Sequence, residues 1–524
     1  MLRKTYRFTN QARACRLGIG AFAWMGAVAA GCSGDDDKAD NDKVSQSSST
    51  ERAGTGAGGK AGGEDAAGGK AGGGVAAGGK SGGGDTPTSS GKVASGTLTE
   101  AKCGSEDTPE KGLQGDVNTG TVNCGLTLLS DIPFGGSVQG SGHCGYVRTG
   151  GVIKAFNLAD PLKPVQTDEE PAVGGSESMR AQTVDGRAIL VSGRGVYDIS
   201  NCEDIVKKGE ITWPSMNAQS GNYMRALSSH EISISHDAKR VYSGLGFNIA
   251  YIDDLDKPET WTVKNWSCEM NMQSGFPITV PNACDGPSHQ DVGRQYSHSS
   301  DDNLEGTVWY GANQEGSSSQ MERSTARMVD ISDPDSIKIL DTVANFPGHS
   351  MNWWRTPDGR DFIIGANEAL GRADSCVAYP RPTNLGNALD AYVVEVTDNK
   401  FGEPFTLTLD INKPENCQAA KTSGANATIT EHSLYNKGDA AFVMLEFGSA
   451  GLRVFDLRDG EHPKEAAYYN DGKGHTHSGV FSYDEARGIM VASGRQAMHV
   501  LMLEPQTIEA LGLPKPTDPK YPYK

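Results

Sequence analysis

The feature that most constrains the fold of this chain is a short segment that recurs seven times after residue 150. Each copy is a run of aliphatic, β-branched or aromatic residues, usually ending in an acidic or amide side chain and followed by a turn with Asp, Ser or Pro. The copies occupy 151–161, 194–201, 248–258, 326–334, 391–398, 451–459 and 498–505. Apolar runs of this length between turn signals are typical of β-strands.

A second apolar run precedes most of the copies, at 188–191, 240–243, 308–311, 361–365, 441–445 and 488–492. Successive copies start about 40 to 80 residues apart, which is typical of β-propeller blades with loop insertions. Radial stacking of small sheets buries their faces and leaves only short edges. The sequence therefore predicts an all-β chain with a β-propeller over 136–510, most simply with seven blades and with six or eight as alternatives. Segment 96–135 is a candidate for the strand that closes the ring, and the Pro-rich tail 511–524 is expected to be extended.

The N-terminus has the pattern of a secretory signal. Residues 1–16 carry five basic side chains and no acid, and the apolar stretch Leu17–Ala30 is too short to cross a bilayer. The end of this stretch, Ala29-Ala30-Gly31-Cys32, resembles the lipobox of bacterial lipoproteins. That resemblance implies that 1–31 are removed and that Cys32 is acylated, which anchors the chain to a membrane. An ordinary signal peptide with a chance cysteine is the alternative.

Segment 32–95 consists almost entirely of Gly, Ala, Ser, Asp and Lys, with Gly-Gly-Lys triplets at 58–60, 68–70 and 78–80. Such a chain cannot bury enough apolar surface to offset its conformational entropy, so we expect a disordered tether. As a coil it would reach roughly 45 Å. A tether between a lipidated residue and a domain suggests an exported protein held at the outer membrane or the cell surface.

The overall charge limits the partners. A net charge of −18 repels nucleic acid and anionic lipid, so neither is expected to bind the domain directly. A protein or glycan ligand, together with membrane contact through the N-terminal lipid, is compatible with this charge.

Eight cysteines follow Cys32, and an even number in an exported chain suggests disulfides. They are Cys103, Cys124, Cys144, Cys202, Cys268, Cys284, Cys376 and Cys417. No Cys-x-x-Cys occurs, which argues against a thiolate zinc site. The expected pairs are 103–124, 268–284 and 376–417, because each brackets a local irregular stretch, and 144–202 is the pair that remains.

The repeats themselves carry a family resemblance. Met328-Val-Asp-Ile-Ser-Asp-Pro334 and Val454-Phe-Asp-Leu-Arg-Asp459 resemble the repeats of LVIVD-type β-propellers of exported bacterial proteins. The resemblance covers 136–510, and the chain departs from it by long insertions at 268–288 and 371–388. The family implies the fold but no settled reaction.

Five histidines form the candidate site, because each precedes a repeat strand by a similar interval. They are His230, His298, His349, His432 and His477, with His475 close to the last. If each opens the inner strand of its blade, ring symmetry brings the imidazoles together on the axis, where they could bind copper, iron or zinc. Glu231 and Glu431 could orient them from outside. The arrangement resembles that of carotenoid-cleaving oxygenases and selenium-binding propellers, which also use axial histidines.

Two other interpretations of these histidines stay open: structural hydrogen bonds between blades, or a ligand pocket without metal. The remaining histidines, His143, His236, His289, His462 and His499, are expected in loops or at the surface. No Gly-x-Ser-x-Gly, P-loop or His-Glu-x-x-His motif occurs. The sequence thus leaves two functions: a membrane-anchored binding module, or alternatively an oxidase or oxygenase whose metal lies on the axis.

Overall fold

The computed structural model divides the chain into two units, Met1–Thr86 and Pro87–Lys524, and all of the residues that it describes belong to the second. These residues are 101–110, 121–174, 179–213, 231–243, 248–265, 299–313, 325–344, 346, 350–366, 390–407, 409–410, 428–434, 442–472, 482–494 and 496–524. The predicted signal, Cys32 and the tether lie outside them. No helix of the described part is long and apolar enough to span a bilayer.

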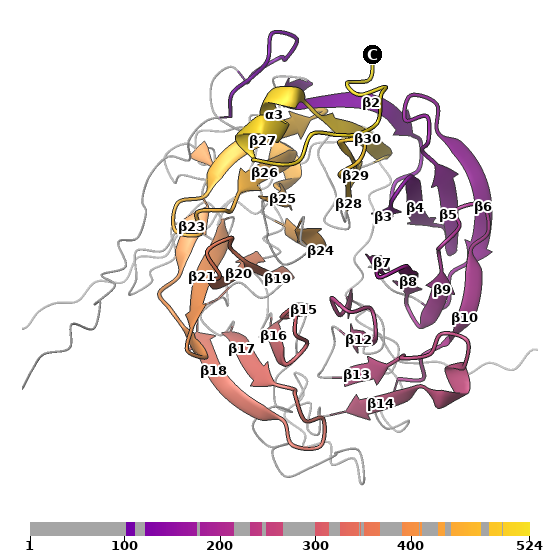
Figure 1. Ribbon diagram of the computed structural model, residues 1–524, viewed down its shortest axis with the longest axis vertical. Helices are drawn as coiled ribbons and strands as arrows, with labels where there is room; N and C mark the ends of the chain where they lie inside the picture. Colours follow the sequence, from indigo (N-terminus) through magenta and orange to yellow (C-terminus); the bar gives the residue numbers. More distant parts are fainter. Residues whose placement is uncertain are drawn as a thin grey trace, which may run out of the picture. The chain divides into compact units, whose positions relative to one another are not determined.

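Seven antiparallel sheets stand around a common axis in the described residues (Figure 1). Blades 1 and 2 comprise β3 (Ser137–Ser141), β4 (Cys144–Thr149), β5 (Val152–Asn157), β6 (Val165–Pro171), β7 (Met179–Val184), β8 (Arg187–Ser192), β9 (Gly195–Asp198) and β10 (Val206–Glu210). Blades 3 and 4 comprise β11 (Ile232–Ile234), β12 (Arg240–Ser243), β13 (Asn248–Tyr251), β14 (Thr262–Asn265), β15 (Ser299–Asp302), β16 (Val308–Asn313), β17 (Thr325–Asp330) and β18 (Lys338–Ala344).

Blades 5 and 6 each have a fifth strand. They comprise β19 (Ser350–Arg355), β20 (Asp361–Ala366), β21 (Ala391–Thr397), β22 (Lys400–Phe401), β23 (Phe405–Leu407), β24 (Thr428–Leu434), β25 (Phe442–Glu446), β26 (Leu452–Asp456), β27 (Lys464–Asn470) and β1 (Val122–Cys124). Blade 7 comprises β28 (Ser482–Asp484), β29 (Ile489–Ser493), β30 (Met498–Leu503) and β2 (Leu126–Ile132). The prediction of an all-β, seven-bladed propeller is confirmed.

The first and last parts of the propeller meet in blade 7. β2 comes from near the start of the domain and pairs antiparallel with β30, with Leu126 opposite Leu503. Helix α3 (Pro505–Ala510) follows β30 directly, and the tail after it packs back onto blade 7, where the hydroxyl of Tyr521 donates to the Leu503 carbonyl at 2.8 Å. An N-terminal strand therefore completes a sheet whose other three strands are C-terminal, which holds the ring closed.

The seven sequence repeats form the third strand of each blade, namely β5, β9, β13, β17, β21, β26 and β30. The acidic residue that ends several copies has a local role. The carboxylates of Asp198, Asp330 and Asp456 each accept the backbone N–H two residues later, at 3.0 Å in all three cases. This Asx turn starts the connection to the fourth strand, so the repeat pattern encodes a strand together with the turn that ends it.

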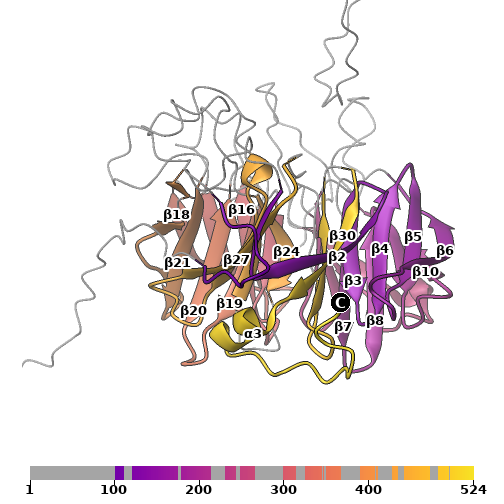
Figure 2. The same ribbon diagram turned by 90° about the horizontal axis from the view of Figure 1, so that it is seen from above.

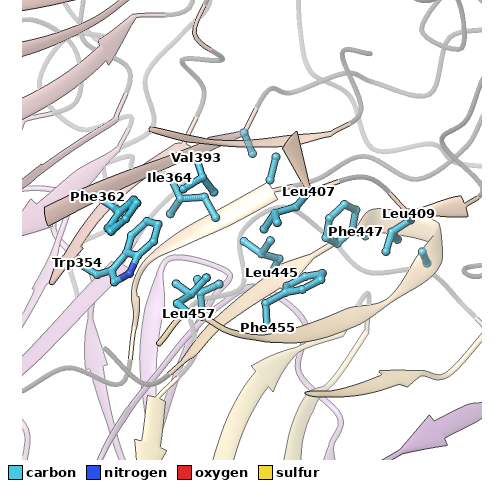
Figure 3. Packing of buried hydrophobic residues seen from close by; sticks show 14 residues of the cluster. Trp354, Phe362, Ile364, Val393, Leu407, Leu409, Leu445, Phe447, Phe455 and Leu457 are labelled. Atoms are coloured by element: carbon cyan, nitrogen blue, oxygen red, sulfur yellow. The ribbon is translucent and has the colours of Figure 1, made fainter. Parts of the chain in front are cut away.

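Large apolar side chains from neighbouring blades fill the space between them. One such cluster joins blades 5 and 6: Trp354 stacks on Phe362 with ring centroids 5.1 Å apart, and Leu445 and Phe455 of the next blade belong to the same cluster (Figure 3). Complete burial of side chains of this size contributes about 1.5–3 kcal/mol each. The core is therefore distributed around the ring between the blades.

Two of the expected disulfides are present, Cys103–Cys124 and Cys144–Cys202. The first ties the segment 101–110 to the end of β1, and the second joins the start of β4 in blade 1 to the turn after β9 in blade 2. The other four cysteines, Cys268, Cys284, Cys376 and Cys417, lie outside the described residues, so their pairing stays a prediction.

Candidate functional site

The two faces of the propeller carry connections of different kinds. Because the strands of each blade alternate in direction, first-to-second and third-to-fourth connections lie on one face, which we call the hairpin face. Second-to-third connections and those leading to the next blade lie on the other, which we call the insertion face (Figure 2). The inner, first strand of every blade therefore starts at the insertion face and ends at the hairpin face.

The longest stretches of sequence between consecutive strands all join strand ends at the insertion face. They span 211–231, 266–298, 314–324, 367–390, 408–427 and 471–481. The longest connection on the hairpin face is 252–261. The long connections belong to the arc from the end of blade 2 to the start of blade 7, whereas blade 1 has a two-residue connection at 150–151. One face of the propeller is thus elaborated over a limited arc.

Four of the five predicted site histidines precede an inner strand in the sequence, and the fifth falls inside one. His298 and His349 directly precede β15 and β19, His230 comes two residues before β11, His432 lies within β24, and His477 precedes β28. Their side chains lie outside the described residues, as does that of Glu431, so the axial metal site stays a prediction. Glu231 is described, and its side chain is buried just ahead of β11.

A different cluster of titratable groups lies at the opposite ends of the inner strands. His236 follows β11 on the hairpin face, and Asp301 and Asp302 end β15 of the next blade. The His236 Nε2 atom lies 3.6 Å from Asp301 Oδ1, and its backbone N–H donates to Asp302 Oδ1 at 3.3 Å. The aspartates are 1% and 0% exposed and the His236 side chain 9%. The cluster therefore joins blades 3 and 4 beside the axis.

Asp302 is held by three neighbours from blade 3. Besides the His236 N–H, the Tyr242 hydroxyl donates to its Oδ2 at 2.9 Å, and Arg240 Nη2 lies 3.5 Å from the same atom. Burial raises the pKa of Asp302, although Arg240 and His236 act against this. Burial also raises the pKa of Tyr242 well above its usual value. The tyrosine therefore stays a neutral donor to this carboxylate.

Asp301 also has a structural role that recurs elsewhere in the ring. Its Oδ2 accepts the backbone N–H of Trp353 in blade 5 at 2.8 Å. Gln139 of blade 1 does the same for Ala181 of blade 2, at 2.9 Å. The inner edge of a blade has no neighbouring strand to pair with, so polar side chains of the preceding blade satisfy its backbone donors.

The structure corrects one of the expected histidine locations. His236 and His499 were expected in loops or at the surface. His236 lies in the turn after β11, with its side chain mostly buried against Asp301, whereas His499 lies within β30 at 1% exposure. His499 Nδ1 contacts Asp131 Oδ1 of β2 at 2.6 Å, across the strand pair that closes the ring. His462 is exposed, as expected, and His289 lies outside the described residues.

Sequence reasoning missed the His236 cluster, because the feature that marks it is visible only in the structure. The strand Ser299-Ser300-Asp301-Asp302 contains no apolar residue, yet all four residues are buried. A wholly polar strand cannot pack on an apolar core, which marks it as an inner strand whose side chains satisfy polar groups of other blades.

The fold and this geometry define the class of the protein as a seven-bladed β-propeller. No protein-family model matches the sequence, and no curated protein matches it. Among solved structures, a protein from Lactobacillus plantarum is 12% identical over 52% of this chain and 69% of its own, with a TM-score of 0.31. An S. cerevisiae Dbp5 complex with Nup159 and Gle1 is 7% identical over 77% and 99%, and the N-terminal domain of Nup159 is 6% identical over the same shares, both with a TM-score of 0.36. With TM-scores below 0.5, these likenesses carry no argument about function.

Proposed function

We propose that this chain is an exported, lipid-anchored β-propeller of the LVIVD-repeat type whose insertion face binds a protein or glycan outside the cell. The observation that carries the proposal is the concentration of all the long connections on one face and one arc of the ring. Binding residues of proteins are concentrated on loops that a rigid scaffold positions, and seven mutually packed blades are such a scaffold.

The place where the chain joins the ring is compatible with this orientation. β1 is the outermost strand of blade 6 and β2 the outermost strand of blade 7, so the segment that follows the proposed tether enters at the rim. The Cys103–Cys124 disulfide fastens it there. An anchor that joins the rim leaves the insertion face accessible to a ligand.

The resemblance to LVIVD repeats supports the family assignment. All seven repeat copies occupy the same strand position, and the acidic residue of the motif forms the Asx turn that ends the strand in blades 2, 4 and 6. A motif with one structural role in each blade is what duplication of a single blade would produce.

Two measurements test the proposal. In cells fed a labelled fatty acid, the wild-type chain should carry the label and sediment with membranes, and Cys32→Ser should abolish both. For binding, the full chain is applied to a glycan array and photo-crosslinked on intact cells. A variant with 367–389 replaced by a short Gly-Ser turn should lose the signal, whereas a variant with the hairpin-face connection 158–164 altered at exposed positions should keep it.

The outcomes that would contradict the proposal are distinct. Membrane association that survives Cys32→Ser would refute the lipid anchor. A ligand signal that is indifferent to replacement of both 314–324 and 367–389, in variants with wild-type circular dichroism, would refute the assignment of binding to the insertion face.

A further inference from the structure

Three groups of His, Cys, Asp or Glu side chains in the described residues bring their ligand atoms within 4.8 Å of one another. Two of them, around Cys144 and around Cys103, contain cysteines that are joined in disulfides, so no thiolate is present to bind a metal. The third group is His236, Asp301 and Asp302, in which all three side chains can be ligands.

The spacing of this group is that of a first coordination shell. Ligand atoms about 2.0–2.2 Å from a shared cation lie roughly 3–4 Å from one another. The His236 Nε2 to Asp301 Oδ1 distance is 3.6 Å, and one oxygen of Asp302 lies within the same 4.8 Å limit. A carboxylate oxygen has two lone pairs, so it can accept a backbone hydrogen bond and still bind a cation.

The surrounding residues hold the two carboxylates in place. The Trp353 backbone N–H fixes Asp301 by its Oδ2, and the Tyr242 hydroxyl fixes Asp302 by its Oδ2. The Trp353 ring also packs edge-on against the His236 imidazole, with centroids 5.6 Å apart. Outer hydrogen bonds and contacts of this kind orient metal ligands in known sites.

The charge of the cluster also favours a cation. Asp301 and Asp302 are both nearly inaccessible to solvent, and Arg240 is the cation described beside them, at 3.5 Å from Asp302. Arg240 is shared with Asp237, whose carboxylate lies 3.3 Å from the same nitrogen. Buried carboxylates require compensating charge, which a bound cation would supply.

We propose that His236, Asp301 and Asp302 bind one divalent transition-metal ion, Zn²⁺ or Mn²⁺, at the hairpin-face ends of the inner strands. One imidazole with two carboxylates is a ligand set that suits these ions. The ion clamps blade 3 to blade 4 beside the axis. His236, Asp301 and Asp302 are not members of the predicted axial histidine set, and the proposed site does not depend on the proposed binding function.

The test uses the full chain, purified without an affinity tag and freed of metal with a chelator. Isothermal titration with Zn²⁺ and with Mn²⁺ should show one equivalent bound at the cluster and a higher melting temperature with the ion. His236→Ala removes the imidazole but keeps the backbone N–H that contacts Asp302, and should weaken this equivalent at least about tenfold. His462→Ala, an exposed hairpin-face histidine, is the matched control and should leave binding unchanged.

A variant of the predicted axial set and a spectroscopic measurement distinguish the two possible sites. His349→Ala alters the predicted axial set, so loss of the equivalent in this variant but not in His236→Ala would overturn the proposal and assign the ion to the insertion face. If His236→Ala fails to fold, pulsed electron paramagnetic resonance of Mn²⁺ bound to the wild type decides: a coupled histidine nitrogen and a spectrum unchanged in His349→Ala support the site. A wild-type chain that binds neither ion stoichiometrically overturns it.

Discussion

Arg453 is the side chain whose removal should destabilise this propeller most clearly. It lies on β26, is 0% exposed and donates from Nη1 to Glu465 Oε1 at 3.1 Å and from Nη2 to the carboxylate of Glu110. Its Nε and Nη2 also donate to the Ala450 carbonyl, at 3.0 and 2.8 Å. The guanidinium therefore joins the N-terminal segment 101–110 to blade 6 in a site without water access.

The expected loss of stability follows from the two buried carboxylates that Arg453→Ala leaves without their arginine. Glu465 and Glu110, with side chains 1% and 8% exposed, would lose the cation that compensates them. Breaking a buried ion pair by removing one partner costs about 3–5 kcal/mol. An exposed pair is worth about 0–1 kcal/mol, so Arg458→Ala, which removes the more exposed pair with Asp456 in the same blade, is the matched control.

The assay is urea unfolding of the full chain with its disulfides intact, in which stability is the product of the midpoint and the slope m. We expect the large loss for Arg453→Ala at pH 7, with m unchanged. Combining Arg453→Met with neutral replacements of both glutamates should recover much of the loss. A cost at pH 7 no greater than that of Arg458→Ala would refute the reasoning.

Three further predictions concern the backbone, a carboxyl group and a disulfide. Gly125 has a φ of 71°, and a Cβ there would lie 2.2 Å from a side-chain oxygen. Gly125→Ala should therefore lower the free energy of unfolding by about 3 kcal/mol or more, as measured with urea. Gly142→Ala is the control: its Cβ would meet open space, and the expected loss is about 1–2 kcal/mol. Burial raises the pKa of Glu504 above its ordinary 4.5, so this residue stabilises the fold in acid, and the contribution is lost as the pH rises through the raised value. Glu504→Gln should therefore be more stable than wild type at pH 7, and its melting temperature should depend less on pH. A pH profile identical to that of the wild type would contradict this. Replacing Cys144 and Cys202 together by Ala opens a link across 58 residues and should cost about 4 kcal/mol in the chain-entropy model, measured against wild type under oxidising conditions.

The third strands of the blades could be predicted from the sequence because their information is local. The segment Leu452–Asp456, in which apolar residues flank Arg453, forms a strand, and the aspartate that ends it accepts the backbone N–H two residues later. Both features are contained within a few residues, so the strand recurs in every blade and the aspartate turn in blades 2, 4 and 6, whichever blades are the neighbours. The number of blades follows from counting such units, since each third strand belongs to a separate sheet.

The inner strands and the His236 cluster could not be predicted in this way, because their determinants lie in other blades. Ser299–Asp302 has the composition of a loop, and only the backbone donors of the next blade explain why it is buried. His499 was expected in a loop or at the surface, yet it is buried in β30, where Asp131 of the N-terminal strand β2 is its partner. Both assignments require knowledge of which blades are neighbours.

The hairpin face holds the ring together, and this explains how the insertion face can vary. Arginines at the first-to-second turns of four blades reach the next blade around the ring. Arg187, Arg240 and Arg487 donate to backbone carbonyl groups there, and Arg360 pairs with a carboxylate. Each such contact stands on a short turn of defined geometry, so it fixes the angle between neighbouring blades from one side. Changes in the connections at the opposite face would leave these contacts in place, so the proposed ligand site could change without weakening the closure of the ring.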